Sequence, residues 1–314
     1  MNRSMQTPTG RTSAPLARSR KRNAFWDKFF HALFLLCAMV AVLSVVAIAG
    51  FILVKGLAPF IPGNAEGTYS FWDFLTGMSW KPGSGVFGIG YMIVASIFAT
   101  LGALVIGVPI GLFTAVMIAE VAGPRLAKVL RPVIELLAGI PSVLYGVFGY
   151  AVIAQVVRAI SPHQVGDSLL TVILVLSIMI LPTIVSIAES AIRAVPNAYR
   201  EGAYALGCTR MEVIFKVVLP AARSGILAAV VLGIGRAIGE TMAVILVAGN
   251  PEGGFPGSLF DKVRLITNNI VLEQGYASGL HEQMLFSTGV VLFAFIMGIN
   301  LILAKIKKRI GGGD

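Results

Sequence analysis

Arg236 and Glu240 stand out among the charged residues of this chain because both lie inside an apolar run at 224–248. At a helical rise of about 1.5 Å per residue, Arg236 lies about 17 Å into that run, near the middle of a membrane span. Charges at that depth are costly unless they are paired or face water, so both side chains should face other helices or an aqueous path. A guanidinium fork suits the recognition of two oxygens of an oxyanion.

The i, i+4 spacing of Arg236 and Glu240 predicts that both lie on one helix face, where they neutralise each other. This pattern leaves two roles open. In the first, Arg236 binds an oxyanion in transit and Glu240 balances its charge when the path is empty. In the second, the two residues form a structural ion pair between helices of the bundle.

Glu135 and Ser142 are the further candidates for such a path. Glu135 follows Pro132 by three residues, and because proline favours the first helical position, Glu135 is predicted in a first turn stabilised by the helix dipole. Ser142 lies in the stretch 139–146, where glycines and a proline predict an unwound segment that exposes backbone groups. Pro182 predicts a kink in the following apolar run.

The composition defines the class of protein. The chain has 314 residues, of which 56% are hydrophobic and 13% charged, far too apolar for a soluble domain of this size. The net charge of +10 does not indicate nucleic acid, because the basic residues lie mostly in tails and loops that flank apolar runs. The two cysteines define no disulfide framework, and the histidines have no metal-ligand spacing, so we expect no metal site: Cys37, Cys208, His31, His163 and His281.

The apolar runs predict an all-α integral membrane protein with six spans: 29–54, 87–118, 130–157, 168–189, 224–248 and 284–304. An even number of spans places both termini on one side of the membrane. That side carries 19 Lys and Arg residues, with Arg131 at the edge of its span included, against 5 on the other side. Because positive residues accumulate in cytoplasmic segments, we predict that both termini are cytoplasmic.

The same pattern divides the chain into segments. We predict a disordered basic cytoplasmic arm at 1–28, because it is polar and lacks the apolar content to fold. The others are a first transmembrane helix at 29–54, an extracytoplasmic amphipathic segment at 55–86, a core at 87–304 with a cytosolic loop at 191–222, and a cytoplasmic tail at 305–314. The polar, glycine-rich segment 249–283 suits a cap over the outer mouth.

The loop contains the stretch EGAYALGCTRMEVIFKVVLP at 201–220. Its first part predicts a short helix from Tyr199 to Leu206 with a face of small residues. Gly207 should end this helix in the left-handed conformation, Thr209 should cap the next helical segment, and Pro220 should end it. Two short helices joined by a turn are therefore predicted between two membrane spans.

This stretch resembles the coupling loop of ATP-binding-cassette (ABC) importer permeases, whose pattern is E-A-A, three residues, G, eleven residues, L-P. Gly202 departs from it, since alanine is usual there. Three more segments resemble the phosphate-specific PstC branch of these permeases. They comprise the residues from PheLeuThrGly at 74–77 to Glu120, the stretch RPVIELLAGIPSVLYG at 131–146, and GIGRAIGETMA at 233–243.

The resemblance implies the type I ABC importer permease fold and a location in a bacterial or archaeal cytoplasmic (inner) membrane. It implies a phosphate importer in which this chain forms half of the path, beside a PstA-like permease, two PstB-like ATPases and a PstS-like phosphate-binding protein outside. The chain has no G-x-x-x-x-G-K-[ST] motif, so ATP and Mg would be bound by the partner ATPase, and no cofactor by this chain. The residues expected to couple to the ATPase are Tyr199, Glu201, Gly202, Ala203, Leu206, Gly207, Leu219 and Pro220.

Three alternatives remain. The first is an ABC permease for another oxyanion such as sulfate or molybdate. Glu240 argues against sulfate, because a carboxylate can accept a proton-bearing phosphate oxygen but repels an anion without a proton. The second is a secondary transporter driven by an ion gradient, and the third is a membrane scaffold without transport. The coupling-loop pattern favours an ATP-driven transporter over both.

Overall fold

The computed structural model of the chain describes residues 17–311. The first part of the arm expected at 1–28 therefore lies outside the described residues, up to residue 16. Residues 17–28 were expected to be disordered, but they are helical and begin α1. Alanine, arginine and lysine are good helix formers, so the apolar helix continues into this basic stretch. The tail expected at 305–314 is likewise helical up to Gly311, as the end of α14.

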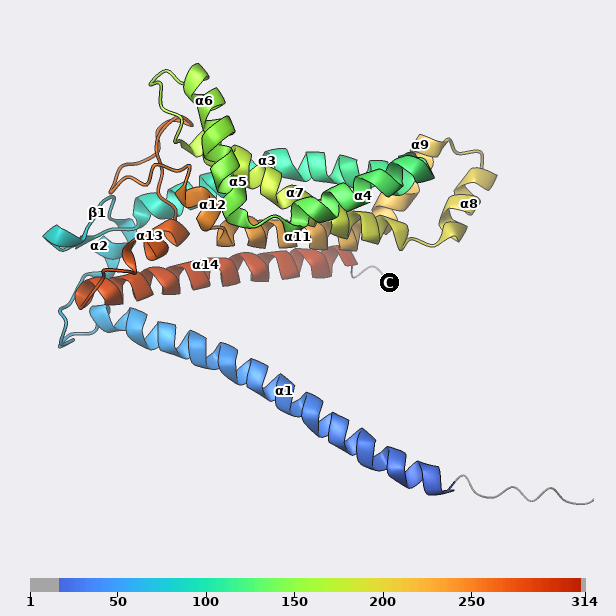
Figure 1. Ribbon diagram of the computed structural model, residues 1–314, viewed down its shortest axis with the longest axis horizontal. Coiled ribbons are helices and arrows are strands. Elements are labelled where there is room, and N and C mark those ends of the chain that lie inside the picture. The colour runs from blue at the N-terminus through green and yellow to red at the C-terminus, as the bar shows by residue number, and fades with distance from the viewer. Residues whose placement is uncertain (1–16, 312–314) are drawn as a thin grey trace, which may run out of the picture. The chain divides into compact units, whose positions relative to one another are not determined.

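The described chain is mostly helical (Figure 1). Its elements, in order, are α1 Ala17–Leu57, η1 Ala58–Phe60, α2 Phe71–Thr76, β1 Trp80–Lys81, η2 Pro82–Ser84, β2 Val86–Phe87, α3 Gly90–Val116, η3 Met117–Val121, α4 Pro124–Gly139, α5 Ser142–Phe148, η4 Gly149–Ile153, α6 Ala154–Ile160, α7 Leu169–Arg193, α8 Asn197–Ala205, α9 Arg210–Glu212, η5 Val213–Val218, α10 Leu219–Ala221, α11 Arg223–Gly239, α12 Met242–Ile245, α13 Ile266–Glu273 and α14 Leu280–Gly311.

The chain divides into two compact units, residues 1–52 and 53–314. In the first unit, α1 exposes large apolar side chains on all sides from Trp26 onward. A helix that is apolar all round is suited to lipid or to a membrane-embedded partner. In the second unit, the last turn of α1 packs on α14, where Ser287 Oγ donates a hydrogen bond to the carbonyl of Gly56 at 2.7 Å.

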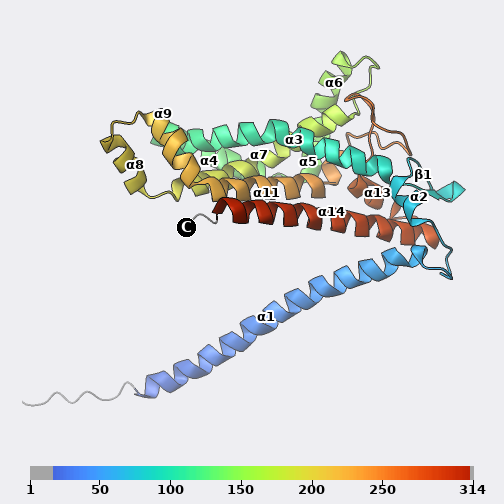
Figure 2. The same ribbon diagram turned by 180° about the vertical axis from the view of Figure 1, so that it is seen from behind.

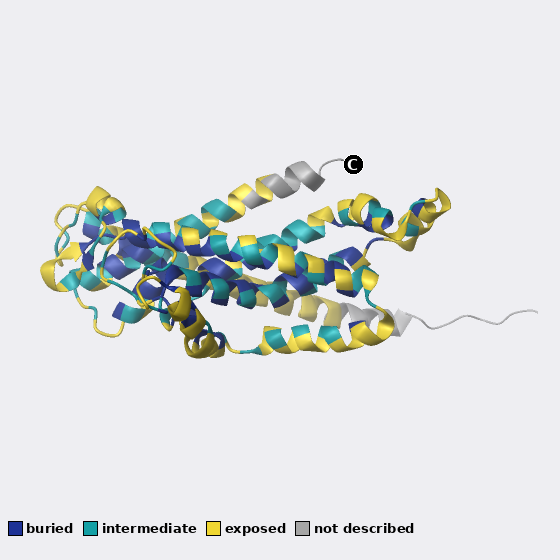
Figure 3. Cartoon of the chain, turned by 90° about the horizontal axis from the view of Figure 1, so that it is seen from above, coloured by how far each residue is buried: buried dark blue, intermediate teal, exposed yellow. Residues whose placement is uncertain are grey.

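Helix α7 is the centre of the second unit, between α3 and α11, and most of its apolar residues are buried (Figure 3). Its contact with α3 depends on two glycines. A Cβ atom at Gly107 would lie 2.7 Å from Ile180, and one at Gly111 would lie 2.8 Å from Ile184. These contacts show that the two glycines of α3 allow close helix packing.

The two ends of this bundle differ (Figures 1 and 2). One end, here the loop end, holds α8 and α9, and the opposite end, here the cap end, holds α2, β1 and α13. At the cap end, β1 and β2 form an antiparallel hairpin that pairs Trp80 with Phe87. The segment 55–86 was expected to be amphipathic, and its aromatic side chains are divided: Phe74 and Trp80 are fully buried, whereas Phe71 and Trp72 are exposed. Phe74 and Trp80 share a core with residues of α13 and α14, so this part of the segment belongs to a packed cap.

Five described helices are long and apolar enough to cross a membrane, and a bent pair, Arg210–Ala221 with Arg223–Gly239 at 70°, would make a sixth. Two of the expected spans are not single helices. The run 130–157 is broken at Ile140, which is extended, and α4 before the break is amphipathic. The run 224–248 is broken at Glu240, which is also extended. The structure confirms the break expected within 139–146, whereas α7 stays helical through Pro182.

Candidate functional site

The loop 191–222 has the local structure that its sequence predicts. Helix α8 ends next to Gly207, whose φ of +84° is left-handed. Thr209 accepts a hydrogen bond from the amide of Glu212, and the Glu212 side chain accepts one from the amide of Thr209, which forms a capping box at the start of α9. The exposed Glu212 also binds Lys216, and the hydrogen bonds from Lys216 and Thr209 lower the pKa of Glu212 to about 2.

An ion pair attaches this loop to the end of α3. Arg200 of α8 donates to Glu120 of η3 through Nη2 at 2.6 Å and through Nε at 3.2 Å. The two side chains are only 16% and 13% exposed, so water screens this pair less than a surface pair. Arg200 also donates to the carbonyl of Ile192 at 3.0 Å, and Arg210 of α9 donates to the carbonyl of Glu120. Helix α8 is therefore held to both α3 and α7.

A second cluster of charges links α4 with α7 at the same end. Glu189 of α7 accepts hydrogen bonds from Arg131 of α4 at 2.7 Å and from Arg193 at 2.8 Å. Arg193 also donates to the carbonyl of Ile118 in η3 at 2.9 Å. The sequence showed these residues only as charges near the ends of apolar runs. These hydrogen bonds join residues up to 75 positions apart in the sequence, so the spacing of neighbouring residues does not reveal them.

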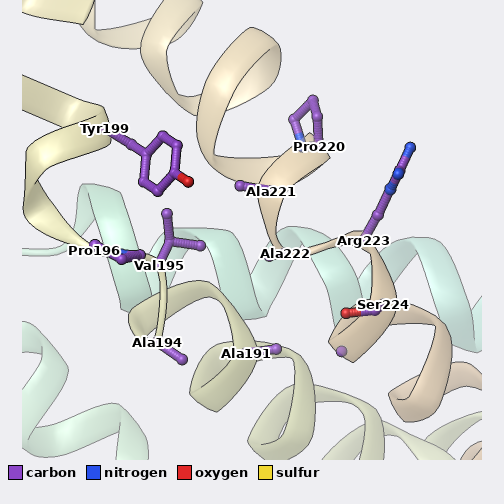
Figure 4. Close-up of a pocket in the computed structure, with 11 residues that line it drawn as sticks. Ala191, Ala194, Val195, Pro196, Tyr199, Pro220, Ala221, Ala222, Arg223 and Ser224 are labelled. Atoms are coloured by element: carbon purple, nitrogen blue, oxygen red, sulfur yellow. The ribbon is translucent and has the colours of Figure 1, made fainter. Parts of the chain in front are cut away.

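A cavity of 650 Å³ lies between the end of α7, the start of α8 and the turn from α10 to α11. The Tyr199 ring borders one side, and the turn from Pro220 to Arg223 borders the other (Figure 4). Two residues expected to contact an ATPase, Tyr199 and Pro220, therefore line one hollow. Leu206 is 87% exposed, so it is available to a partner. The last expected contacts, Glu201, Gly202, Ala203 and Leu219, lie on α8 and α10.

Arg236 and Glu240 do not form the pair predicted from their spacing. Helix α11 ends at Gly239, and the extended Glu240 leaves the helix face on which Arg236 lies. The side chain of Glu240 instead accepts a hydrogen bond from the amide of Ala243 at 3.0 Å, at the start of α12. Its carbonyl accepts one from Thr267 of α13 at 3.0 Å. The i, i+4 prediction was wrong because it assumed a helix that continues through the glycine.

The Arg236 side chain is bound by α7. Its Nη1 donates to Thr183 Oγ1 at 3.2 Å, and the side chain is partly exposed. Among the described residues, no carboxylate pairs with Arg236. The structure thus holds an arginine within an apolar helix by a neutral hydroxyl. We expect a charged side chain within an apolar membrane helix to face an aqueous path or a partner rather than lipid.

The helices that follow the two breaks, α5 and α12, pack on each other. Gly146 of α5 packs so closely on α12 that a Cβ atom there would lie 2.8 Å from Cα and from the carbonyl oxygen of Ala243. On the same helix, Tyr145 donates a hydrogen bond to the carbonyl of Leu137 at 2.6 Å, so α5 is joined to α4 across the first break. Breaks inside membrane proteins are tolerated where they border a cavity or other protein, so this meeting point is the candidate site.

Glu135 and Ser142 flank the first break. Glu135 was expected in a first helical turn, but it lies near the end of α4, which begins at Pro124 after the extended Gly123. It is exposed and lines a 540 Å³ groove with Ile140 and other residues of the break. Ser142 begins α5. Within residues 17–311, no hydrogen bond or ion pair joins either residue to Arg236.

Gly235 and Gly239 have the same four-residue spacing as the packing glycines Gly107 and Gly111. In this chain they lie open, since a Cβ atom at either position would meet no atom within 4 Å. Both flank Arg236 on α11. The open face is therefore not used for packing among the described residues.

The cap end holds a buried charge pair that sequence reasoning missed. Arg264 donates to Glu273 at 2.6 Å, and the two side chains are 5% and 9% exposed. Asn268 of α13 donates to Asn250 at 2.9 Å. Within the segment 249–283, composition suggested only a polar cap, because loop residues carry no periodic pattern that reveals burial.

Known proteins share this architecture. The family of binding-protein-dependent transport system inner membrane components matches residues 107–312. A probable ABC transporter permease of Bacillus subtilis, YqgH, is 39% identical over 86% of this chain and 89% of its own length. The phosphate transport system permease protein PstC of Mesorhizobium japonicum is 34% identical over 92% of each chain. PstC of Pasteurella multocida is 34% identical over 78% of this chain and 83% of its own length.

Solved structures agree on the fold. A bacterial alginate ABC transporter in complex with an alginate pentasaccharide-bound periplasmic protein superposes with a TM-score of 0.65, at 18% identity, over 94% of this chain and 98% of that chain. The inward-facing MetNI methionine ABC transporter superposes with a TM-score of 0.54, at 18% identity, over 71% of this chain and 94% of that chain.

The chain is thus a multi-pass membrane permease with the type I ABC importer fold. It belongs to the family of binding-protein-dependent transport system inner membrane components, and its expected resemblance to PstC permeases is confirmed. Members of this family are transmembrane subunits rather than ATPases.

Proposed function

We propose that this chain is a permease subunit of an ATP-driven phosphate importer and forms half of its path across the cytoplasmic membrane. Phosphate is proposed as the substrate because the chain is similar to a phosphate permease along nearly its whole length, with 34% identity over 92% of the chain. The placement of Arg236, with no carboxylate partner among the described residues, supports an anion as the substrate.

In this proposal, Arg236 contacts phosphate oxygens where the two broken helices meet. Glu240 fixes the second break through its bond to Ala243, and Ser142 begins the helix after the first break. Glu135 borders the approach to that break. An arginine is suited to this role because its guanidinium presents a planar fork to two oxygens and stays charged at all physiological pH values.

The proposed partners follow from the permease class. They are a second permease subunit of the PstA kind, two cytosolic ATPases of the PstB kind that bind ATP and Mg, and an extracytoplasmic phosphate-binding protein of the PstS kind. Helix α8 would insert into the ATPase, with Tyr199, Leu206 and the small residues around Gly202 at the contact. The loop end and both termini would then be cytoplasmic.

Movement would pass from the loop to the path through two connections. The ion pair between Arg200 and Glu120 attaches α8 to η3, the continuation of α3. The α10 turn leads directly into α11, which is one helix from Arg223 to Gly239 and carries Arg236. When the ATPases close and open, a rigid shift of α8 would therefore change the position of Arg236 relative to its neighbours.

The direct test is uptake of radiolabelled phosphate into proteoliposomes that contain the whole complex and enclose ATP, with the binding protein added outside. We expect uptake that requires ATP and is not reduced by a tenfold excess of sulfate. Sulfate or molybdate uptake in place of phosphate uptake would assign a different oxyanion. Uptake that needs an ion gradient and no ATP would contradict the proposal.

A further inference from the structure

We propose that Thr183 is a positioning residue for Arg236, a role that rests on the proposed phosphate path. An arginine side chain has several rotatable bonds, so holding it in one place costs conformational entropy. Thr183 Oγ1 accepts a hydrogen bond from Arg236 Nη1 at 3.2 Å. Both side chains are partly exposed, so the contact borders accessible space rather than the core.

The chain around Thr183 is fixed by its neighbour Ile184. A Cβ atom at Gly111 of α3 would lie 2.8 Å from Cγ2 of Ile184, and one at Gly233 of α11 would lie 3.0 Å from its Cγ1. Ile184 is fully buried between these two helices. Gly233 precedes Arg236 by three residues on the same helix face. The packing of Ile184 on Gly233 therefore fixes the position of Thr183 along the helix axis relative to Arg236.

The chemistry of threonine suits this position. Its hydroxyl accepts a hydrogen bond from the guanidinium but carries no charge, so Arg236 keeps its full positive charge for an anion. A carboxylate at this place would neutralise Arg236 and compete with the substrate. Glu240, the nearest carboxylate in sequence, is instead engaged with the amide of Ala243 at 3.0 Å. The side chain of Thr183 thus orients Arg236 while the break keeps Glu240 away.

The test compares Thr183→Val, which has the same shape without the hydroxyl, with Thr183→Ser, which keeps it. The complete complex is reconstituted with ATP, and both radiolabelled phosphate uptake and ATP hydrolysis are measured. A matched control is Thr114→Val, because the hydrogen bond that the Thr114 hydroxyl makes within residues 17–311 stays on its own helix, to the carbonyl of Ile110 at 2.8 Å. The readout is phosphate transported per ATP hydrolysed.

We expect Thr183→Val to lower this ratio about tenfold, as loss of one hydrogen bond to a charged group does at about 1.4 kcal/mol per factor of ten. Thr183→Ser should restore most of it, and Thr114→Val should match the wild type. A Thr183→Val complex that transports as much phosphate per ATP hydrolysed as the wild type would overturn the positioning role. This holds whether its rates of phosphate uptake and ATP hydrolysis are both normal or both lowered. Absence of phosphate uptake in the wild-type complex would instead overturn the proposed function and with it this role.

Discussion

Arg200 and Glu120 form an ion pair at 2.6 Å although they lie 80 residues apart, and this pair joins α8 of the loop to the end of α3. Both side chains are mostly buried, and Arg200 donates further hydrogen bonds to two backbone carbonyls near the end of α7. Helix α8 is thus fixed to the bundle by a side chain rather than only by its own connecting chain. A rigid attachment of this kind transmits force from a partner to the membrane helices.

The first prediction concerns this attachment. Replacing Arg200 by Gln should lower phosphate uptake about tenfold while the complex still assembles, because Glu120 loses its partner and α8 can move without α3. Uptake and co-purification of the ATPase are measured together. Lys216→Gln is the matched control, since it breaks an exposed ion pair with Glu212 in the same loop. Equal uptake in the Arg200 and Lys216 variants would show that the attachment does not transmit movement.

The second prediction concerns the break in the run 224–248. Glu240→Gln keeps an oxygen that can accept the bond from the amide of Ala243, whereas Glu240→Ala removes it. Loss of a helix-capping acceptor costs about 1 kcal/mol, so the Ala variant should unfold at a lower temperature than the Gln variant. Thermal unfolding in detergent measures this difference. If the Gln and Ala variants lose the same stability, Glu240 acts through its charge and not as a cap.

The third prediction concerns the contact between the broken helices. Gly146→Ala places a Cβ atom 2.8 Å from the backbone of Ala243, so α5 and α12 must separate and the variant should lose stability and uptake. Gly202→Ala is the control, because a Cβ atom there meets nothing within 4 Å. It should raise thermal stability slightly, since alanine favours helices over glycine by about 1 kcal/mol. A Gly146→Ala variant that is as stable as the control would show that α5 and α12 are not in close contact.

The fourth prediction concerns the buried pair at the cap end. Glu273→Gln leaves Arg264, which is 4% exposed, without its negative partner. Removal of one partner of a buried pair costs about 3 to 5 kcal/mol, which should lower the unfolding temperature markedly. The comparison is Glu212→Gln, where the side chain is exposed and the change should be small. Similar unfolding temperatures for the two variants would mean that the Arg264 pair adds no stability.

Local chemistry in the sequence was sufficient to predict the loop. Gly207 is left-handed, and Thr209 caps α9, because a helix end and a helix start each depend on residues within a few positions. The apolar runs likewise located the spans, since burial in lipid requires length and composition that are visible in any window of the sequence.

The sequence was misleading where two local signals competed. Pro132 suggested a helix start, yet α4 begins at Pro124, because the extended Gly123 before it ends the preceding segment. The run containing Arg236 and Glu240 looked like one helix. Gly239 and the hydrogen bond from the amide of Ala243 to the Glu240 side chain permit a break that apolar periodicity does not show. Thr183 is one of several hydroxyl residues in the run 168–189, so the sequence alone does not distinguish it from the others.

The central claim is that Arg236 contacts phosphate on its way through the permease. The most direct measurement is uptake of radiolabelled phosphate by the complete complex that carries Arg236→Gln, with Arg236→Lys as the variant that keeps a positive charge. We predict that the Gln variant assembles normally and transports less than about a tenth of the wild-type rate, and that the Lys variant is intermediate because it lacks the planar fork. An assembled Gln variant that transports phosphate at the wild-type rate would contradict the account.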